Sequence, residues 1–303
     1  MNPWQSIHDD SDFSIIGGAS NTPSILIEES RLEECMDYYQ EHKLTRISIP
    51  PYYTHSMRDL EFLNNYPYIR GVSLQSVGEI DISGLRYLDR LEYLLLVENK
   101  APFDLANFPY LIEFRGDWYP KLRITSDCRR LQILDLSKYK PKSKDLTELA
   151  ELPVLEDLSI VQSPLTSISG IGRFPGLNCL ALTYLTKLES IAAICELKDS
   201  QLEIMECEVC KKIRDHDAVK CVPSLRTLRF NNCGEIPSIG FLDGLKNLED
   251  FRFVDTNVID GDLRPLLRLK SAGFFKKKHY SHTPEEIDAI LDASKVAPRN
   301  PIE

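Results

Sequence analysis

One short phrase recurs along most of this chain. It is a leucine or isoleucine, an apolar residue three positions later, and another apolar residue two positions after that. The copies begin roughly 20 to 25 residues apart, a period typical of a solenoid. Their first residues are Leu44, Ile69, Leu91, Leu111, Leu131, Leu155, Leu177, Leu202, Leu225, Leu248 and Leu269. About ten to eleven copies should therefore stack, each contacting only its neighbours.

The spacing inside each phrase predicts a β-strand. Leu94 and Leu96 stand two residues apart, so both side chains lie on one face of an extended segment. Tyr93, Leu95 and Val97 should point to the other face. One such strand cannot bury its apolar row alone, but a parallel sheet of neighbouring copies can.

The return path of each repeat carries its own apolar residues at spacings of three and four. In the copy that starts at Leu155, these are Leu165, Ile168, Ile171 and Phe174. Such spacing predicts a short helical turn, either α or 3₁₀, opposite the sheet.

The ninth position of the phrase carries a small polar residue or cysteine in five copies, which can bond the turn backbone. These five are Asn99, Ser163, Cys210, Cys233 and Thr256, whereas other copies have Tyr52, Val77, Tyr119, Tyr139 and Leu185. Over about 44–275, the period and phrase resemble the short bacterial class of leucine-rich repeat seen in internalins. The resemblance implies an α/β solenoid, a leucine-rich repeat horseshoe with a concave parallel β-sheet and short convex helical or 3₁₀ segments.

The two ends predict caps, because a solenoid exposes its core unless covered. Residues 1–43 should form an N-terminal cap, with a strand at 23–30 and an amphipathic helix at 31–42. The repeats then occupy 44–275. Residues 276–303 should form a C-terminal capping helix and tail. In that segment Thr283 and Glu286 make a capping box before an apolar stripe of Ile287, Ile290 and Leu291.

Composition narrows the possible partners. The net charge is −10, which argues against nucleic-acid binding and suits a cationic protein partner. The first residues show no secretory signal, and no apolar stretch is long enough to span a membrane. Internalins are exported, so the chain departs from them in this respect. We expect a cytoplasmic protein, without a membrane partner and monomeric when unbound.

The cysteines allow two interpretations. Cys207, Cys210, Cys221 and Cys233 have a spacing that thiolate ligands of zinc can show. The repeat register instead places Cys207 inside and Cys210 and Cys233 at the ninth position, where cysteine acts as a small buried residue. We favour the second interpretation and expect neither a metal nor another cofactor. A cytosolic setting also argues against disulfides.

The chain carries no recognised catalytic motif. It lacks a phosphate-binding loop, a nucleophile elbow and a zinc protease signature, and its six histidines are scattered. We therefore predict that it is not an enzyme, with no catalytic residues.

The side chains that point away from the core should form the binding surface, centred on copies three to six. The first two copies offer little there, with Arg46 and Ser48, then Gly71 and Ser73. Later copies combine aromatic residues with charges, the combination found at interface hot spots. Aromatic residues that fill gaps in irregular repeats remain an alternative. The predicted protein-binding residues are Tyr93, Leu95, Val97, Glu113, Arg115, Asp117, Trp118, Tyr119, Asp135, Tyr139, Asp157, Glu206, Glu208, Arg229 and Arg252.

The leading hypothesis is therefore a protein-binding module that uses its concave face. A narrower version is an immunity or antidote protein that neutralises a basic toxin. An adaptor or a secreted effector scaffold is the alternative, and an enzyme or metal-binding protein is the alternative of another class.

Overall fold

A computed structural model describes residues 6–7, 13–17, 22–49, 57–75 and 80–296 of the chain. The chain divides into two compact units, Met1–Leu136 and Ser137–Glu303. Tyr52, Val77 and the predicted tail at 297–303 lie outside the described residues, as do parts of the predicted N-terminal cap.

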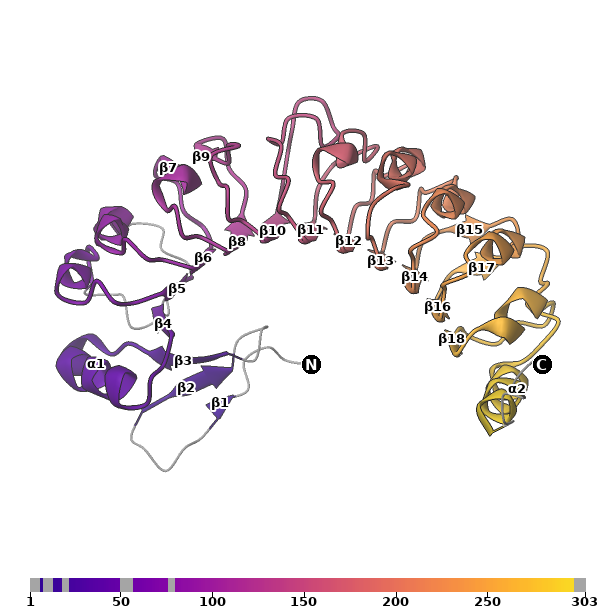
Figure 1. Ribbon diagram of the computed structural model, residues 1–303, viewed down its shortest axis with the longest axis horizontal. Coiled ribbons are helices and arrows are strands. Elements are labelled where there is room, and N and C mark those ends of the chain that lie inside the picture. The colour runs from indigo at the N-terminus through magenta and orange to yellow at the C-terminus, as the bar shows by residue number, and fades with distance from the viewer. Residues whose placement is uncertain (1–5, 8–12, 18–21, 50–56, 76–79, 297–303) are drawn as a thin grey trace, which may run out of the picture. The chain divides into compact units, whose positions relative to one another are not determined.

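Each repeat of the first unit contributes one strand to a sheet (Figure 1). The first two pairings, β1 with β2 and β2 with β3, are antiparallel, and the pairings from β3 to β8 are parallel. The strands in order are β1 (Ser6–Ile7), β2 (Ile15–Gly17), β3 (Pro23–Leu26), β4 (Arg46–Ile49), β5 (Gly71–Leu74), β6 (Tyr93–Leu96), β8 (Glu113–Asp117) and β10 (Ile133–Ser137). Two short strands, β7 (Phe103–Asp104) and β9 (Leu122–Arg123), pair separately.

The second unit repeats the same pattern with parallel pairing throughout. Its sheet strands are β11 (Asp157–Val161), β12 (Cys179–Thr183), β13 (Ile204–Glu208), β14 (Thr227–Asn231), β16 (Asp250–Arg252) and β18 (Ser271–Gly273). A separate pair consists of β15 (Glu235–Ile236) and β17 (Asn257–Val258). The predicted strands and their parallel order are thereby confirmed, and each unit has the leucine-rich repeat fold.

Alternate residues of each strand separate the two faces of the sheet. In the repeat strands from β4 to β16, the second and fourth residues point into the core; in β11, for example, Leu158 and Ile160 are 1% and 0% exposed. The first, third and fifth residues face the opposite way, and we call the surface they form the open face. Because strand pairing is in register, residues at one position form rows across neighbouring strands, such as Ser159, Ala181, Glu206 and Arg229.

The return path of most repeats forms a 3₁₀-helix, on the side of the repeat away from the open face (Figure 1). In the first unit these are η3 (Glu61–Asn65), η4 (Ile82–Tyr87) and η5 (Leu105–Asn107), and a further 3₁₀-helix, η1 (Glu29–Arg31), lies before the first repeat. In the second they are η6 (Ile171–Arg173), η7 (Ala192–Leu197), η8 (His216–Cys221), η9 (Gly240–Gly244) and η10 (Arg264–Arg268). The predicted return-path residues Leu165, Ile168, Ile171 and Phe174 are all fully buried.

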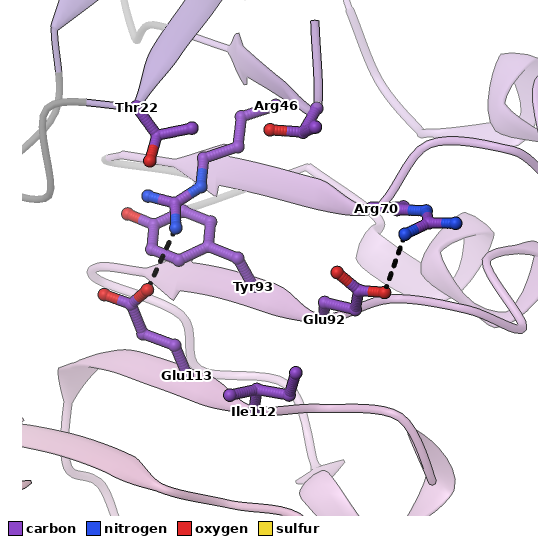
Figure 2. A pocket seen from close by; sticks show the side chains of 8 residues that line it. Thr22, Arg46, Arg70, Glu92, Tyr93, Ile112 and Glu113 are labelled. Carbon is purple, nitrogen blue, oxygen red and sulfur yellow. Dashed lines mark hydrogen bonds and ion pairs between the residues drawn. The ribbon is translucent and has the colours of Figure 1, made fainter.

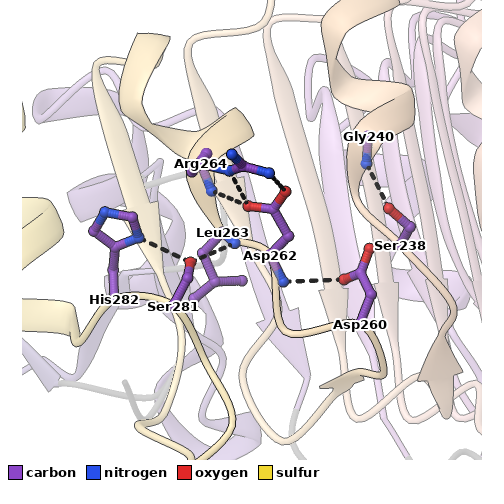
Figure 3. Close-up of polar contacts among 8 residues, drawn as sticks. All are labelled: Ser238, Gly240, Asp260, Asp262, Leu263, Arg264, Ser281 and His282. Atoms are coloured by element: carbon purple, nitrogen blue, oxygen red, sulfur yellow. Dashed lines mark hydrogen bonds and ion pairs between the residues drawn. The ribbon is translucent and has the colours of Figure 1, made fainter.

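Short polar side chains bond the backbone at or just before the start of several 3₁₀ segments, and Asp81 and Asp104 cap η4 and η5 in this way. A serine or aspartate accepts a hydrogen bond from the backbone N–H two residues later, which satisfies a donor that the helix start leaves unpaired. Figure 3 shows Ser238 with Gly240 and Asp260 with Asp262. Asp262 also binds the Arg264 guanidinium through both carboxylate oxygens, at 2.8 and 2.6 Å, and these hydrogen bonds lower the pKa of Asp262 to about 2.

The five polar or cysteine side chains at the ninth position bond backbone groups, as predicted, and four of them reach the backbone of the preceding repeat. Ser163 Oγ donates to the Tyr139 carbonyl oxygen, and Thr256 Oγ1 donates to that of Phe230. The thiols of Cys210 and Cys233 donate to the carbonyl oxygens of Leu182 and Cys207, at 3.4 and 3.2 Å. Asn99 bonds its own turn, through the backbone of Ala101.

The residue before the ninth position adopts a left-handed backbone in many repeats. It is Val209 in one of them, with a φ of 56°, and Asn232 in the next repeat. A β-branched residue is strained in this conformation, whereas asparagine tolerates it.

We therefore expect Val209→Asn to raise the free energy of unfolding by about 1 kcal/mol. Denaturant titration would measure the change. Gln162→Asn is the matched control, because Gln162 has a similar φ of 53° but is not β-branched. An equal gain in both variants, or a loss in Val209→Asn, would contradict this explanation.

Within residues 1–43, the strand predicted at 23–30 is shorter in the structure: β3 ends at Leu26, and Glu29–Arg31 form η1. Helix α1 (Leu32–Glu41) follows β3 and turns Cys35, Met36 and Tyr39 inward, where they are 0–4% exposed. The sequence predicts this helix at 31–42, one residue longer at each end. It packs beside β3, which pairs in parallel with β4 and so joins the cap to the first repeat.

Helix α2 (Pro284–Val296) forms the C-terminal cap and contacts β18 and η10 of the last repeat. The capping box is reciprocal: the Thr283 N–H donates to Glu286 Oε2, and the Glu286 N–H donates to Thr283 Oγ1. Ile287 and Leu291 are buried, but Ile290 is 40% exposed, so its place in the apolar stripe was wrong. Among the described residues, no helix has both the length and the apolar character needed to cross a membrane.

The cysteines include one disulfide, which corrects the expectation that none would form. It joins Cys195 of η7 to Cys221 of η8, whose Cα atoms are 5.0 Å apart. The two lie close because neighbouring 3₁₀ segments stack on the return side. Cys207, Cys210 and Cys233 occupy the predicted inward and ninth positions as buried free thiols. Because Cys221 is bonded to Cys195, it is not a fourth thiolate beside these three cysteines.

His216 is a buried titratable group in the second unit. It is 1% exposed, its Nε2–H donates to the Cys233 carbonyl oxygen at 2.9 Å, and its ring stands edge-on to Phe230. Burial lowers the pKa of His216 below its usual value of 6.5. The unfolded chain therefore takes up a proton at this histidine more readily than the folded protein does.

The contribution of His216 to stability should be complete above about pH 6.5 and should decline as the pH falls below that value. We expect the denaturation midpoint to drop between about pH 7.5 and 5.5, and to drop less in His216→Gln. Denaturant titrations at both pH values test this. The same drop in both proteins would mean that other groups cause it.

Candidate functional site on the open face

One row of the open face links four strands of the first unit through a single arginine. Strand register aligns Arg46, Gly71, Tyr93 and Glu113 on β4, β5, β6 and β8. Gly71 has no side chain, and a Cβ there would lie 2.5 Å from Arg46 Cγ. Arg46 therefore crosses β5 freely and stacks its guanidinium on the Tyr93 ring, 3.6 Å from the centroid. Its Nη2 reaches Glu113 Oε2 at 3.0 Å.

Glu113 is the centre of this polar network. Its side chain is only 8% exposed, and it pairs with Arg46 on one oxygen and with Arg115 Nε on the other, at 2.6 Å. Arg115 Nη1 lies 3.4 Å from Asp135 Oδ2, which extends the network to β10. Burial also raises the pKa of Tyr93, so the phenol stays neutral. A buried carboxylate held by two guanidinium groups fixes the geometry of this surface.

The first two copies therefore contribute more than their sequence suggested. The Arg46 side chain extends from β4 across β5 to Glu113 of β8, and Gly71 leaves the space for it. The signal was present in the sequence as a row: the first strand residue of four successive copies reads basic, glycine, aromatic and acidic. Sequence reasoning compared residues within each copy and did not compare copies along the row.

The predicted aromatic residues differ in exposure. Tyr93 is 9% exposed beneath Arg46, so it packs within the surface, the alternative that the sequence left open. Trp118 is half-buried. Tyr119 is also half-buried but occupies the ninth position of its repeat, where its hydroxyl accepts a hydrogen bond from the side-chain amide of Asn99, the ninth-position residue of the preceding repeat. Leu95, Val97 and Asp117 are also half-buried on the open face.

Tyr139 does not lie on the open face. It occupies the ninth position of its repeat and is 2% exposed, so its assignment to the binding surface is corrected. A ninth-position side chain turns inward beneath the loop, and a tyrosine there fills the volume that Asn or Cys fills elsewhere. Burial raises the pKa of Tyr139 well above its usual value.

The open face of the second unit carries mainly charged residues from β13 to β16. Arg229 Nη1 binds Glu206 Oε1 at 2.5 Å, between neighbouring strands. Arg252 pairs with Asp250 on its own strand at 3.1 Å. Glu208 is exposed at the end of β13, and Asp157 is half-buried on β11. The six residues carry four carboxylates against two guanidinium groups, so this surface is acidic.

Beside Asp157 lies Cys179, a half-exposed free cysteine on the open face. Partial burial, with a smaller contribution from Asp157, raises the pKa of Cys179 to about 12. A nucleophilic cysteine acts as the thiolate, and at neutral pH this side chain is a thiol. In the described part of the chain, no group of three or more His, Cys, Asp or Glu side chains is placed to hold a metal ion.

A cavity of about 210 Å³ opens in the first unit, where successive strands begin (Figure 2). Arg46 and Glu113 line one part of it, and Arg70 and Glu92, which precede β5 and β6, line another. Arg70 Nη1 lies 3.1 Å from Glu92 Oε1. Ile112 adds an apolar side chain to the lining. Sequence reasoning missed this cavity, because its walls come from copies that looked unremarkable one at a time.

Comparisons with known proteins return structural matches only. No family model matches the chain, and no curated protein matches it. It is similar to the internalin InlF of Listeria monocytogenes, at 18% identity and a TM-score of 0.29, covering 77% of this chain and 86% of that one. It is also similar to the functional domain of InlJ from the same organism, at 13% identity and 0.36, covering 74% and 57%.

A third solved structure, the leucine-rich repeat protein LIC12759 of Leptospira interrogans, has 15% identity and a TM-score of 0.40, covering 83% and 77%. The repeats, the strand register and the ninth-position hydrogen bonds establish that both units of this chain are built from leucine-rich repeats.

Proposed function

We propose that this chain is a non-enzymatic protein-binding module whose partner docks on the open face. The observation that carries the proposal is the network of Arg46, Tyr93, Glu113, Arg115 and Asp135. It holds large side chains rigid on a surface that covers no core. A surface ordered before binding loses less conformational entropy when a partner docks, which favours affinity.

The half-buried residues beside this network supply apolar contact area. Leu95 lies on the same strand as Tyr93, Val97 follows that strand directly, and Trp118 follows β8 directly. A partner that covered them would remove apolar surface from water around a rigid polar cluster, the usual composition of an interface core.

The partner that best fits the charge is basic. The chain carries a net charge of −10, and the open face of the second unit has twice as many carboxylates as guanidinium groups. Such a surface steers a cationic protein and speeds its approach. A narrower proposal is an immunity or antidote protein for a basic toxin, and a cytoplasmic location belongs with that role.

A second candidate, an exported effector or scaffold, is favoured by one specific observation. The Cys195–Cys221 disulfide suits an oxidising compartment, because cytosolic thiols are kept reduced. Fractionation of the native cell, followed by alkylation before any reductant is added, distinguishes the two. A reduced pair in the cytosolic fraction supports the immunity role, and an oxidised pair outside it supports the exported one.

The binding proposal is tested with the native partner, identified by affinity purification and mass spectrometry. Trp118→Ala should weaken binding by at least about 1–2 kcal/mol, or about 5- to 30-fold. Asp157→Ala should mainly slow association and flatten its salt dependence. Asn107→Ala, on the exposed side of η5, is the control and should bind like the wild type. Loss of binding in the control alone would refute docking on the open face.

A further inference from the structure

Three solvent-accessible aromatic rings gather in the first unit between η3 and β5. Phe62 lies on η3, and Tyr66 and Tyr68 lie in the turn that follows it. The ring centroids of Phe62 and Tyr66 are 6.4 Å apart, and those of Tyr66 and Tyr68 are 6.1 Å apart with the ring planes at 85°. We call these three rings the aromatic cluster. Aromatic side chains that gather at a surface are a feature of binding sites.

Helix α1 holds one side of the aromatic cluster in place. Gln40 Nε2 donates a hydrogen bond to the Tyr68 hydroxyl, and the buried Tyr39 ring packs 6.0 Å from that of Tyr68. Glu33 and Asp37 lie on the same face of α1 as Gln40, because the three are spaced by four and three residues. Both carboxylates are exposed.

The charge beside the aromatic cluster is negative. Slight burial of the phenol, and then the negative charges of Glu33 and Asp37, raise the pKa of Tyr66. Both carboxylates therefore act on the Tyr66 hydroxyl. Within the described residues, neither of them has an ion-pair partner.

Other aromatic rings of the first unit show which group fits such a surface. Arg86 lies 4.4 Å from the ring centroid of Tyr87, and Arg130 lies 5.2 Å from that of Tyr110. In each case the chain supplies its own arginine. By contrast, no described arginine or lysine lies over a ring of the aromatic cluster. The cluster therefore offers a cation the same kind of ring and adds two carboxylates.

We infer that the aromatic cluster, together with Glu33 and Asp37, binds an arginine side chain of a partner protein. The planar guanidinium stacks on a tyrosine ring, as the arginines of this chain do, and donates hydrogen bonds to the carboxylates. A lysine ammonium lacks the flat face for stacking. None of these residues belongs to the open face, so the inference does not rest on the proposed function.

Nuclear magnetic resonance of the full-length chain with isotope-labelled tyrosine rings tests the inference. The probe is a short glycine peptide with two arginines, titrated to about 10 mM. The same peptide with citrulline is its neutral isostere, and a third peptide carries lysine. We expect the arginine peptide to shift the Tyr66 and Tyr68 ring signals saturably, and to bind more tightly than either other peptide. Tyr66→Phe and Tyr68→Phe assign the two signals.

Variants of the rings locate the binding. Tyr66→Leu and Tyr68→Leu should each weaken binding of the arginine peptide about two- to fivefold, the effect of one exposed cation–π contact. The remaining labelled tyrosine reports binding in each variant. Tyr110→Leu is the matched control, because Arg130 already covers that ring, and it should bind like the wild type.

Variants of the carboxylates separate local from general attraction. Glu33→Gln combined with Asp37→Asn should weaken binding without changing the melting temperature, since both side chains are exposed. Asp288→Asn combined with Asp292→Asn removes the same charge at the same spacing from α2 and should leave binding unchanged.

Four results would overturn the inference. They are no saturable shift of Tyr66 or Tyr68, binding of the citrulline or lysine peptide as tight as that of the arginine peptide, wild-type binding in both ring variants, and equal weakening in the two carboxylate pairs.

Discussion

Leu158→Ala should lower the free energy of unfolding by about 2–5 kcal/mol, because it opens a cavity in a core that cannot collapse to fill it. Leu158 is 1% exposed and lies in register with Leu180 of the next strand. Each repeat buries its apolar row against its neighbours alone, so no distant element can compensate for the lost contacts. Denaturant titration followed by circular dichroism measures the loss.

The matched control is the preceding residue. Asp157 is half-buried on the open face, so Asp157→Ala should cost well under about 1 kcal/mol. The contrast depends on the alternation of side chains along β11. Similar losses in the two variants would contradict the assignment of core and open faces.

Removing the disulfide should cost about 2–4 kcal/mol, since it closes a loop between residues 26 positions apart and restricts the unfolded chain. The variant is Cys195→Ala combined with Cys221→Ala, which avoids a new free thiol. Its melting temperature should fall below that of the oxidised wild type. The effect should be local to the second unit, where η7 and η8 stack.

A reductant provides the internal control for this prediction. It should lower the melting temperature of the wild type towards that of the double variant and leave the double variant unchanged. A wild type that does not respond to reductant, although mass analysis shows the bond has been broken, would mean that packing of η7 on η8 alone supplies the stability.

Much of the fold could be predicted because its signals are local and repeated. The core position of a residue such as Leu94 can be predicted from its spacing to Leu91 and Leu96, because the same spacing recurs in every copy. The capping box of Thr283 and Glu286 is likewise contained within four residues. Because most copies of the phrase are regular, the period can be extended through the irregular ones. The strand register was therefore predictable even where the ninth position carries tyrosine.

The candidate site was harder to predict because its contacts run between copies. Arg46 and Glu113 are separated by 67 positions, and only strand register brings them together. The same applies to Cys195 and Cys221, whose proximity depends on how two return segments stack. Tyr139 shows the opposite error, since an aromatic residue near charged ones suggested an interface, whereas its ninth position directs it inward.

The most direct test of the central proposal is site-specific photo-crosslinking in the native cell. A photoreactive amino acid placed at Leu95 or Glu208 samples the open face of each unit. The same residue at Asn107 or Ala192 samples the exposed side of η5 or η7. We expect the partner to be crosslinked from Leu95, Glu208 or both, and from neither 3₁₀ position. Crosslinking from Asn107 or Ala192, with none from the open face, would contradict the proposal.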